Sequence, residues 1–222
     1  MNSSGKATPV AAKICGLKDP GAMHAAVAGG ARYVGLVFYP PSSRAVTAAQ
    51  AAALAALVPR EVEKTGMFVD PDDALLTAIL ARVPLDLIQL HGAESPDRVA
   101  RIKALTGLPV LKAVSVANAG DLDGAAAFDG VADMLLFDAK APKTIADALP
   151  GGNGLVFDWN LLTHRRWQQP WMLAGGLDAE NVAQAVGISG ARAVDVSSGV
   201  ERAPGEKDPA AIKAFLDAVK AL

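Results

Sequence analysis

The sequence is short of the residues that characterise secreted, membrane-spanning and metal-binding proteins. One cysteine and three histidines are present among 222 residues. A lone cysteine cannot form an internal disulfide, so a reducing compartment, the cytoplasm, is expected. No apolar run approaches the ~20 residues that cross a bilayer, and residues 1–9 lack the apolar core of a signal peptide. The histidines have no ligand spacing, and no metal site is expected.

Neither sign of charge predominates. Lysine and arginine number 21 and aspartate and glutamate 23, which gives a net charge of -2 with histidine neutral. Basic and acidic residues are interspersed, which argues against a surface for nucleic acid. The glycine fingerprint of dinucleotide-binding proteins is also absent. The composition favours a protein whose partner is a small molecule.

Eight short runs rich in apolar and β-branched residues recur along the chain. Each has the length of a strand, and their continuous apolar character is typical of strands that are covered on both faces. We predict strands at residues 11–15, 32–38, 64–69, 86–90, 109–114, 133–138, 171–174 and 192–196.

Alanine- and leucine-rich segments with helical spacing separate most of these runs. Several open with a side-chain acceptor at the N-cap and a proline at the first helical position, where its missing N–H costs nothing. Thr47 and Gln50 have the spacing of a capping box. The cap-and-proline signals stand at Asp19-Pro20, Asp70-Pro71, Ser95-Pro96 and Asp208-Pro209.

Strands that alternate with helices predict an α/β fold with a parallel sheet, because each parallel connection needs a crossover of a dozen or more residues. Eight such units close into a single (β/α)8 TIM barrel. We assign residues 11–222 to this barrel, which we expect to be a catalytic domain, and residues 1–10 to a flexible N-terminal leader. One connection, residues 139–158, carries several glycines and no long amphipathic helix. A loop of this length at the barrel top predicts a lid over the substrate.

Two groups that can transfer protons end separate predicted strands. Cys15 closes the first strand and is followed by Gly16, and Asp138 closes the sixth. Active sites of such barrels lie at the carboxyl ends of the strands, so Cys15 is a candidate base and Asp138 a candidate acid. A lone cysteine is more often a buried apolar residue, and Asp138 could instead cap the next segment or pair with Lys140.

Small residues follow the seventh and eighth predicted strands. Gly175 and Gly176 come after the seventh, before a helix expected to open at Asp178, and Ser197-Ser198-Gly199 comes after the eighth. Such turns let backbone N–H groups approach an anion closely, and a helix N-terminus adds positive potential. Although single glycine turns are mostly plain connections, the two together predict a barrel of the phosphate-binding type.

Two further polar residues stand just past predicted strands. Arg44 could clamp a substrate carboxylate by two parallel hydrogen bonds, or could be an ordinary surface arginine in solvent or in a salt bridge. His91 is a rival base, although a lone histidine more often has a structural or substrate-positioning role. No Ser-His-Asp arrangement is evident, since Ser197 and Ser198 belong to the predicted phosphate turn.

These residues stand in motifs that, in this order, resemble those of the phosphoribosylanthranilate isomerase family. The resemblance spans nearly the whole chain from about residue 11. The motifs are Lys13-Ile14-Cys15-Gly16, Gly35-Leu36-Val37-Phe38 with Ser42 and Arg44, Gln89-Leu90-His91-Gly92, Phe137-Asp138, Gly151-Gly152-Asn153-Gly154 with Phe157-Asp158-Trp159, Leu173-Ala174-Gly175-Gly176-Leu177 and Asp195-Val196-Ser197-Ser198-Gly199-Val200-Glu201.

The resemblance implies a cofactor-free Amadori rearrangement of N-(5'-phosphoribosyl)anthranilate in tryptophan biosynthesis. It assigns Asp138 as the acid that opens the furanose ring and Cys15 as the base at C2'. Arg44 would bind the anthranilate carboxylate. The remaining residues implied in substrate binding are His91, Gly154, Asp158, Gly175, Gly176, Ser197, Ser198 and Gly199. The chain departs from the family at Asn153, more often Ser or Thr, and at Ser43, more often Pro.

Two other functions fit parts of the pattern. A histidine-pathway or dual-specificity aminoaldose isomerase uses a similar barrel, but such enzymes have Asp in the base role where this chain has Cys15. Their bisphosphate substrate also calls for a second phosphate turn, which Asp70-Pro71 and His91-Gly92 do not offer. A non-catalytic phosphosugar-binding barrel would keep the phosphate turns without needing both Cys15 and Asp138. The sequence is compatible with a monomer or a homodimer.

Overall fold

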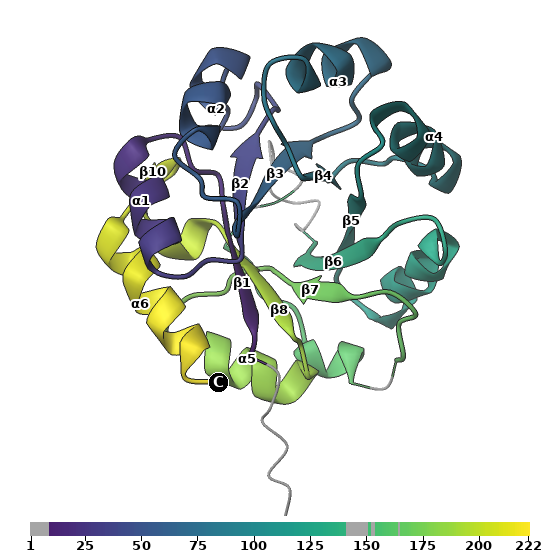
Figure 1. Cartoon of the computed structure of the whole chain (residues 1–222). Helices are drawn as coiled ribbons and strands as arrows, with labels where there is room; N and C mark the ends of the chain where they lie inside the picture. The colour runs from purple at the N-terminus through teal and green to yellow at the C-terminus, as the bar shows by residue number, and fades with distance from the viewer. Residues whose placement is uncertain (1–8, 141–150, 152–153, 164) are drawn as a thin grey trace, which may run out of the picture.

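Eight parallel strands form a closed barrel in the computed structural model, which describes residues 9–140, 151, 154–163 and 165–222. Each strand pairs with its neighbours in chain order, and β1 pairs with β8 to close the ring (Figure 1). The prediction of a single (β/α)8 barrel is confirmed. The strands are β1 Ala11–Cys15, β2 Tyr33–Val37, β3 Glu63–Phe68, β4 Leu87–Leu90, β5 Val110–Val116, β6 Met134–Ala139, β7 Trp171–Leu173 and β8 Ala193–Val196.

Helices surround the barrel on its outside (Figure 1). The last helix, α6, lies against the first, α1, so the two ends of the helical ring meet. The α-helices are α1 Pro20–Ala28, α2 Ala48–Ala55, α3 Asp73–Leu80, α4 Pro96–Thr106, α5 Val182–Ser189 and α6 Pro209–Lys220. The described residues also form three 3-10 helices and one hairpin. The 3-10 helices are η1 Ala119–Phe128, η2 Trp159–Leu162 and η3 Ser198–Val200, and the hairpin consists of β9 Glu201–Ala203 and β10 Glu206–Lys207.

Most of the predicted side-chain caps stand at the N-termini of helices, as the sequence indicated. Asp19, Ser95 and Asp208 each accept a backbone N–H in the first turn of a helix that starts with proline, and Thr47 forms the predicted capping box. The Asp70-Pro71 prediction is wrong, because α3 begins at Asp73 and Asp72 is its cap.

Asp70 has a role in a neighbouring loop instead. Its backbone has a φ of 44°, and its Oδ1 accepts a hydrogen bond from the N–H of Ala93, 2.8 Å away. A Cβ at Gly92 would lie 2.5 Å from this carboxylate. Asp70 therefore fixes the turn that follows β4. Asp72, the next acidic residue along the chain, caps α3 instead.

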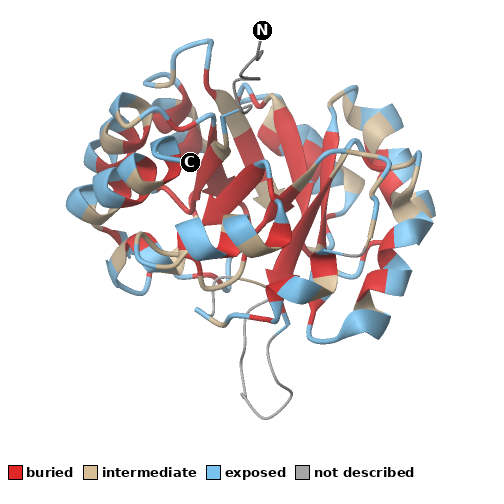
Figure 2. Cartoon of the chain, turned by 90° about the horizontal axis from the view of Figure 1, so that it is seen from below, coloured by how far each residue is buried: buried red, intermediate tan, exposed pale blue. Residues whose placement is uncertain are grey.

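Apolar residues fill both the inside of the barrel and the layer between strands and helices. The strands are buried along most of their length, and the helices expose only their outer faces (Figure 2). Because side chains alternate across a strand, one set points to the barrel axis and the other to the helices. The smaller cluster comes from the strands and the residue that follows β7: Tyr33, Leu87, Leu111, Ala113, Leu136, Met172, Ala174 and Ala193.

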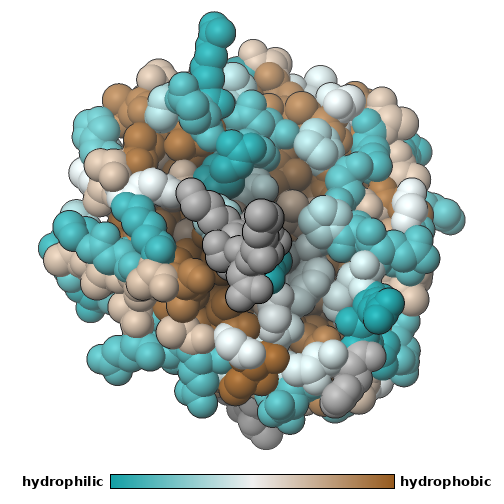
Figure 3. Space-filling model, turned by 60° about the horizontal axis from the view of Figure 1, so that its bottom comes forward, coloured by the Kyte–Doolittle hydropathy of each residue, from teal (hydrophilic) through white to brown (hydrophobic). Residues whose placement is uncertain are grey.

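The surface mixes hydrophilic and hydrophobic residues. On the face turned to the viewer in Figure 3, hydrophilic side chains cluster around the rim and alternate with more apolar ones. Among the described residues, no helix is long and apolar enough to cross a membrane. Residues 1–8, most of the predicted leader, lie outside the described residues.

Candidate active site

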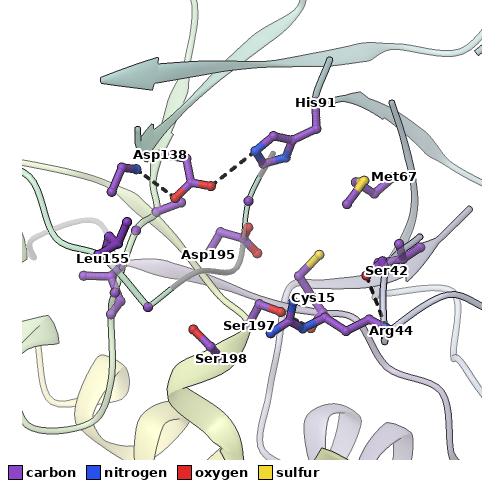
Figure 4. A pocket seen from close by; sticks show the side chains of 18 of the residues that line it. Cys15, Ser42, Arg44, Met67, His91, Asp138, Leu155, Asp195, Ser197 and Ser198 are labelled. Atoms are coloured by element: carbon purple, nitrogen blue, oxygen red, sulfur yellow. Dashed lines mark hydrogen bonds and ion pairs between the residues drawn. The ribbon is translucent and has the colours of Figure 1, made fainter. Parts of the chain in front are cut away.

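One cavity at the carboxyl ends of the strands collects nearly all of the predicted site residues (Figure 4). These residues come from loops far apart in the sequence, and closure of the barrel brings them together. The predicted residues that line it are Cys15, Arg44, His91, Asp138, Gly154, Gly175, Gly176, Ser197 and Ser198.

Cys15 ends β1 as a buried, reduced thiol at the edge of this cavity. Two residues before it, Lys13 lies inside the barrel and is fully buried, and its Nζ donates to Asp195 Oδ1 on β8, 3.0 Å away. A Cβ at Gly35 would lie 2.9 Å from the Cys15 sulfur and 3.1 Å from Lys13 Nζ. Glycine at this position of β2 therefore makes room for the thiol and for the lysine beneath it.

The buried charge of Lys13 is stabilised by its neighbours. Burial alone lowers the pKa of Lys13, but the Asp195 carboxylate and, next in order, the Cys15 sulfur outweigh it, so the pKa lies above its ordinary value. Lys13 is therefore an ammonium ion at neutral pH.

Asp138 ends β6 with a fixed orientation. Its Oδ1 accepts a hydrogen bond from the N–H of Ala139 at 2.9 Å, and its Oδ2 lies 3.2 Å from His91 Nε2 (Figure 4). His91 in turn has its Nδ1 2.9 Å from the amide nitrogen of Gln89. The alternative pairing of Asp138 with Lys140 is not realised, because the ammonium of Lys140 binds Asp121 instead, at 2.6 Å.

One glycine of the connection after β6 approaches this carboxyl group closely. A Cβ at Gly151 would lie 2.8 Å from Asp138 Oδ2 and 2.8 Å from His91 Nε2. Gly154 lines the cavity with a φ of 68°. Residues 141–150 and 152–153 lie outside the described residues, so the predicted lid, with Asn153, is described only in part.

The two predicted phosphate turns lie side by side. Gly175 and Gly176 have φ values of 89° and 60°, which glycine adopts readily. A Cβ at Gly199 would lie 1.9 Å from the carbonyl oxygen of Leu177, so glycine lets the turn after β8 contact the turn after β7. Gly199 itself is not among the residues that line the cavity. Its role here is close packing of the turns.

The helix after the glycine turn starts later than expected. The sequence predicted that it opens at Asp178, whereas α5 begins at Val182. Asp178 Oδ1 accepts the N–H groups of Glu180 and Asn181 at 2.8 and 2.9 Å, which forms a separate turn before the helix. The 3-10 helix η3 begins at Ser198, directly after β8. An anion bound between the turns after β7 and β8 would therefore contact these two turns rather than the N-terminus of a long helix.

Arg44 lines the cavity but is neither solvated nor at the surface. Its Nε and Nη2 donate to Glu201 Oε1 and Oε2 at 2.7 and 2.8 Å, and both side chains are buried. Lys207 Nζ binds the same Glu201 carboxylate at 2.7 Å. The salt bridge that the sequence allowed for Arg44 is thus present, in a buried form within the site.

Asp158 is not brought to the cavity. It is exposed, and its Oδ1 accepts from the backbone N–H of Asn160 at 3.0 Å and from the side-chain amide at 2.8 Å, which caps η2. We therefore leave Asp158 out of the proposed substrate site. The residue types and order of this motif could not distinguish a helix cap from a binding group.

The structure adds residues at or near the site that were not chosen from the sequence. They are Lys13, Gly151, Asp195, Glu201 and Lys207. A signal existed for Lys13 and Asp195, because each is a charged residue inside an apolar strand, and such residues are seldom buried unless paired. Within the described part of the chain, no group of three or more His, Cys, Asp or Glu side chains could hold a metal ion.

The arrangement defines a class of protein. Proton-transfer groups on two strand ends, beside turns of small residues after β7 and β8, are typical of phosphate-binding (β/α)8-barrel enzymes. The comparisons narrow this class. The family model for N-(5'-phosphoribosyl)anthranilate (PRA) isomerase matches residues 12–218. This chain therefore belongs to the phosphoribosylanthranilate isomerase family, as its sequence motifs predicted.

Individual relatives agree along nearly the full length. The N-(5'-phosphoribosyl)anthranilate isomerase of Rhodospirillum centenum is 61% identical over 214 residues, which cover 96% of this chain and 100% of the relative. The crystal structure of phosphoribosyl anthranilate isomerase from Thermotoga maritima has 34% identity and a TM-score of 0.86, and covers 96% of this chain and 100% of that one.

A second solved structure bears on the ligand. It is a phosphoribosyl anthranilate isomerase in complex with reduced 1-(o-carboxyphenylamino)-1-deoxyribulose 5-phosphate. It has 33% identity and a TM-score of 0.83, and covers 96% of this chain and 100% of that chain. That relative therefore binds a phosphorylated small molecule with an aromatic carboxylate.

Proposed function

We propose that this chain isomerises N-(5'-phosphoribosyl)anthranilate to 1-(2-carboxyphenylamino)-1-deoxyribulose 5-phosphate, a step of tryptophan biosynthesis, with Cys15 as base and Asp138 as acid. The observation that carries this proposal is that Cys15 and Asp138, on different strands, line the same cavity as the turns after β7 and β8. The reaction needs an acid at the ring oxygen and a base at C2', which are different atoms of one sugar. Two strand ends supply them from different directions.

In this reaction Asp138 donates one proton and Cys15 accepts one. Asp138 donates its proton to the furanose ring oxygen, the C1'–O bond breaks, and the anthranilate nitrogen forms a Schiff base with C1'. The thiolate of Cys15 then takes the proton from C2', and the C2'–H electron pair forms the enolamine. Tautomerisation removes the proton of the C2' hydroxyl and adds a proton at C1', which gives the ketone. Cys15 then releases its proton to solvent and Asp138 takes one up, so substrate and product have the same composition. This sequence calls for no oxidant or reductant.

The ends of the substrate are bound at opposite sides of this pair. Backbone N–H groups of the turns at Gly175, Gly176, Ser197 and Ser198 can bind the phosphate, and Arg44 the anthranilate carboxylate. Binding at both ends holds C2' and the ring oxygen between the two proton-transfer groups, which replaces a search in solution by a fixed geometry. A reducing compartment such as the cytoplasm suits this role, because the base has to be a free thiol.

The test is turnover of freshly prepared N-(5'-phosphoribosyl)anthranilate, followed by loss of its fluorescence. The histidine-pathway aminoaldose is offered in a parallel reaction. We expect rearrangement of the first substrate and none of the second, because a second phosphate turn is not offered after β3 and β4. Binding of the anthranilate compound without turnover would overturn the proposal in favour of a phosphosugar-binding barrel. Turnover of both compounds would show a dual-specificity isomerase.

A further inference from the structure

Arg44 reaches the cavity as part of a buried three-residue cluster with Glu201 and Lys207. Glu201 follows η3 and Lys207 lies on β10, so both belong to the hairpin after β8. The Glu201 carboxylate accepts two parallel hydrogen bonds from the Nε and Nη2 side of Arg44, at 2.7 and 2.8 Å. The two side chains are only 7% and 4% exposed. A pair of this geometry fixes the plane of the guanidinium as well as its position.

The stem of Arg44 is confined as well. A Cβ at Gly16 would lie 2.7 Å from Arg44 Cδ, so the arginine crosses directly over the residue that follows Cys15. At the start of the side chain, the backbone N–H of Arg44 donates to Ser42 Oγ at 3.2 Å. Glu201 thus holds the guanidinium through its Nε and Nη2 atoms. A guanidinium has five N–H donors in one plane, in a geometry that suits carboxylates.

Lys207 adds a second positive charge to the cluster of Arg44, Glu201 and Lys207. Its Nζ donates to Glu201 at 2.7 Å and to the backbone and side-chain oxygens of Ser197 at 2.9 and 3.2 Å. Within this cluster of three, Arg44 and Lys207 contribute two positive charges and Glu201 contributes one negative charge. Without Lys207, the carboxylate of Glu201 would neutralise the charge of Arg44, and the cluster would attract an anionic ligand only weakly.

The charge of Glu201 itself is secure at neutral pH. Burial alone raises the pKa of Glu201, but the hydrogen bond from Arg44 and the charge of Lys207 outweigh burial and bring the pKa below its ordinary value. The carboxylate is therefore available as a permanent acceptor for Arg44 while substrate binds and leaves.

We propose that Glu201 is the positioning residue that aims Arg44 at the aromatic carboxylate, and that it thereby sets the preference of the enzyme for a carboxylate-bearing ring. This inference rests on the proposed function, since it concerns the same substrate. It differs from a purely structural role of Glu201, which would fasten the β9–β10 hairpin to the loop after β2 and support all ligands equally.

Two probes separate these roles by titration calorimetry. One is reduced 1-(o-carboxyphenylamino)-1-deoxyribulose 5-phosphate, and the other is the same compound without the carboxyl group. The variants are Glu201→Gln, which removes the negative charge, and Glu201→Asp, which keeps the charge on a side chain that is one methylene shorter and so moves the carboxylate away from Arg44. Glu206→Gln, on the exposed pair with Arg202 in the same hairpin, is the matched control. Circular dichroism confirms the fold of each variant.

We expect both Glu201 variants to bind the carboxylate probe about tenfold more weakly, the equivalent of one hydrogen bond to a charged group. Binding of the carboxyl-free probe should stay within about twofold of the parent, because its phosphate and sugar contacts do not involve Arg44. In an Arg44→Ala background, Glu201→Gln should then change neither affinity further. A partly unfolded sample lowers binding of both probes alike, so the ratio of the two affinities within one variant does not depend on the folded fraction.

Equal losses for both probes would overturn the inference and assign Glu201 a structural role. So would an unchanged preference in both Glu201 variants, or a further selective loss in the Arg44→Ala background. Failure of the proposed function has a different signature, because the parent protein itself would then not turn over N-(5'-phosphoribosyl)anthranilate, whether or not it binds the probes.

Discussion

Nε2 of His91 lies 3.2 Å from Oδ2 of Asp138, and both side chains are buried at the cavity wall. The amide of Gln89 holds the other ring nitrogen of His91 at 2.9 Å. His91 was predicted to bind substrate, and its ring nitrogens lie close to these two protein side chains. We propose that the imidazole orients the carboxyl group of Asp138, the proposed acid, and that Gln89 orients the imidazole.

His91→Gln tests this relationship. Loss of the imidazole frees the Asp138 carboxyl group to rotate, so we expect kcat to fall about tenfold or more while KM changes little. Steady-state kinetics on N-(5'-phosphoribosyl)anthranilate measures both parameters. A rise in KM at constant kcat would instead show that His91 binds the substrate in its ground state.

Gly151→Ala should impair catalysis through the same pair. The added Cβ would lie 2.8 Å from Asp138 Oδ2 and 2.8 Å from His91 Nε2, so at least one of them must move. We expect kcat to fall about tenfold or more, because small displacements of a catalytic group are costly. Gly187→Ala in α5, where a Cβ meets nothing within 4 Å, is the control and should keep parental kinetics. Equal activity of the two variants would show that the approach of Gly151 has no catalytic consequence.

Asp195→Asn should destabilise the fold strongly. The substitution leaves the ammonium of Lys13 fully buried without its carboxylate partner. Breaking a buried ion pair in this way costs about 3–5 kcal/mol, and urea unfolding at neutral pH measures the change in free energy. Glu206→Gln, which breaks an exposed pair, should have little effect. A loss below about 1 kcal/mol for Asp195→Asn would contradict the importance of this pair.

The contribution of Glu201 to stability should depend on pH in the acid range. Its pKa in the folded protein lies below the ordinary value of 4.5. A group with a lowered folded-state pKa stabilises the protein above its unfolded pKa, and this stabilisation is lost as the pH falls through the folded value. The gap in unfolding free energy between the parent and Glu201→Gln should thus be constant near neutral pH and narrow below pH 4.5. Urea unfolding at a series of pH values measures this gap, and one that widens with acid would contradict the assignment.

The strands were predictable because their signal is local. Continuous apolar runs with intervening helical segments place each strand within a few residues of its observed bounds, and closure of the barrel follows from their number. The ends of these strands then identify Cys15 and Asp138 without any knowledge of tertiary contacts.

The partners of the site residues were not predictable, because they are distant in sequence. Arg44 and Glu201 are 157 residues apart, and Lys13 and Asp195 are 182 residues apart. Which acidic residue faces which basic one depends on barrel closure and on the loops above it. The same limit explains Asp70, whose bond to the loop after β4 prevailed over a local preference for a helix cap.

The central claim is that Cys15 and Asp138 do the proton transfers in a cavity that binds both ends of the substrate. Its most direct test is kcat for Cys15→Ala and Asp138→Asn, measured beside their affinity for reduced 1-(o-carboxyphenylamino)-1-deoxyribulose 5-phosphate. We predict that each substitution lowers kcat at least about 100-fold and changes the affinity by no more than about threefold. Turnover within about threefold of the parent in either variant would contradict the assignment of that residue.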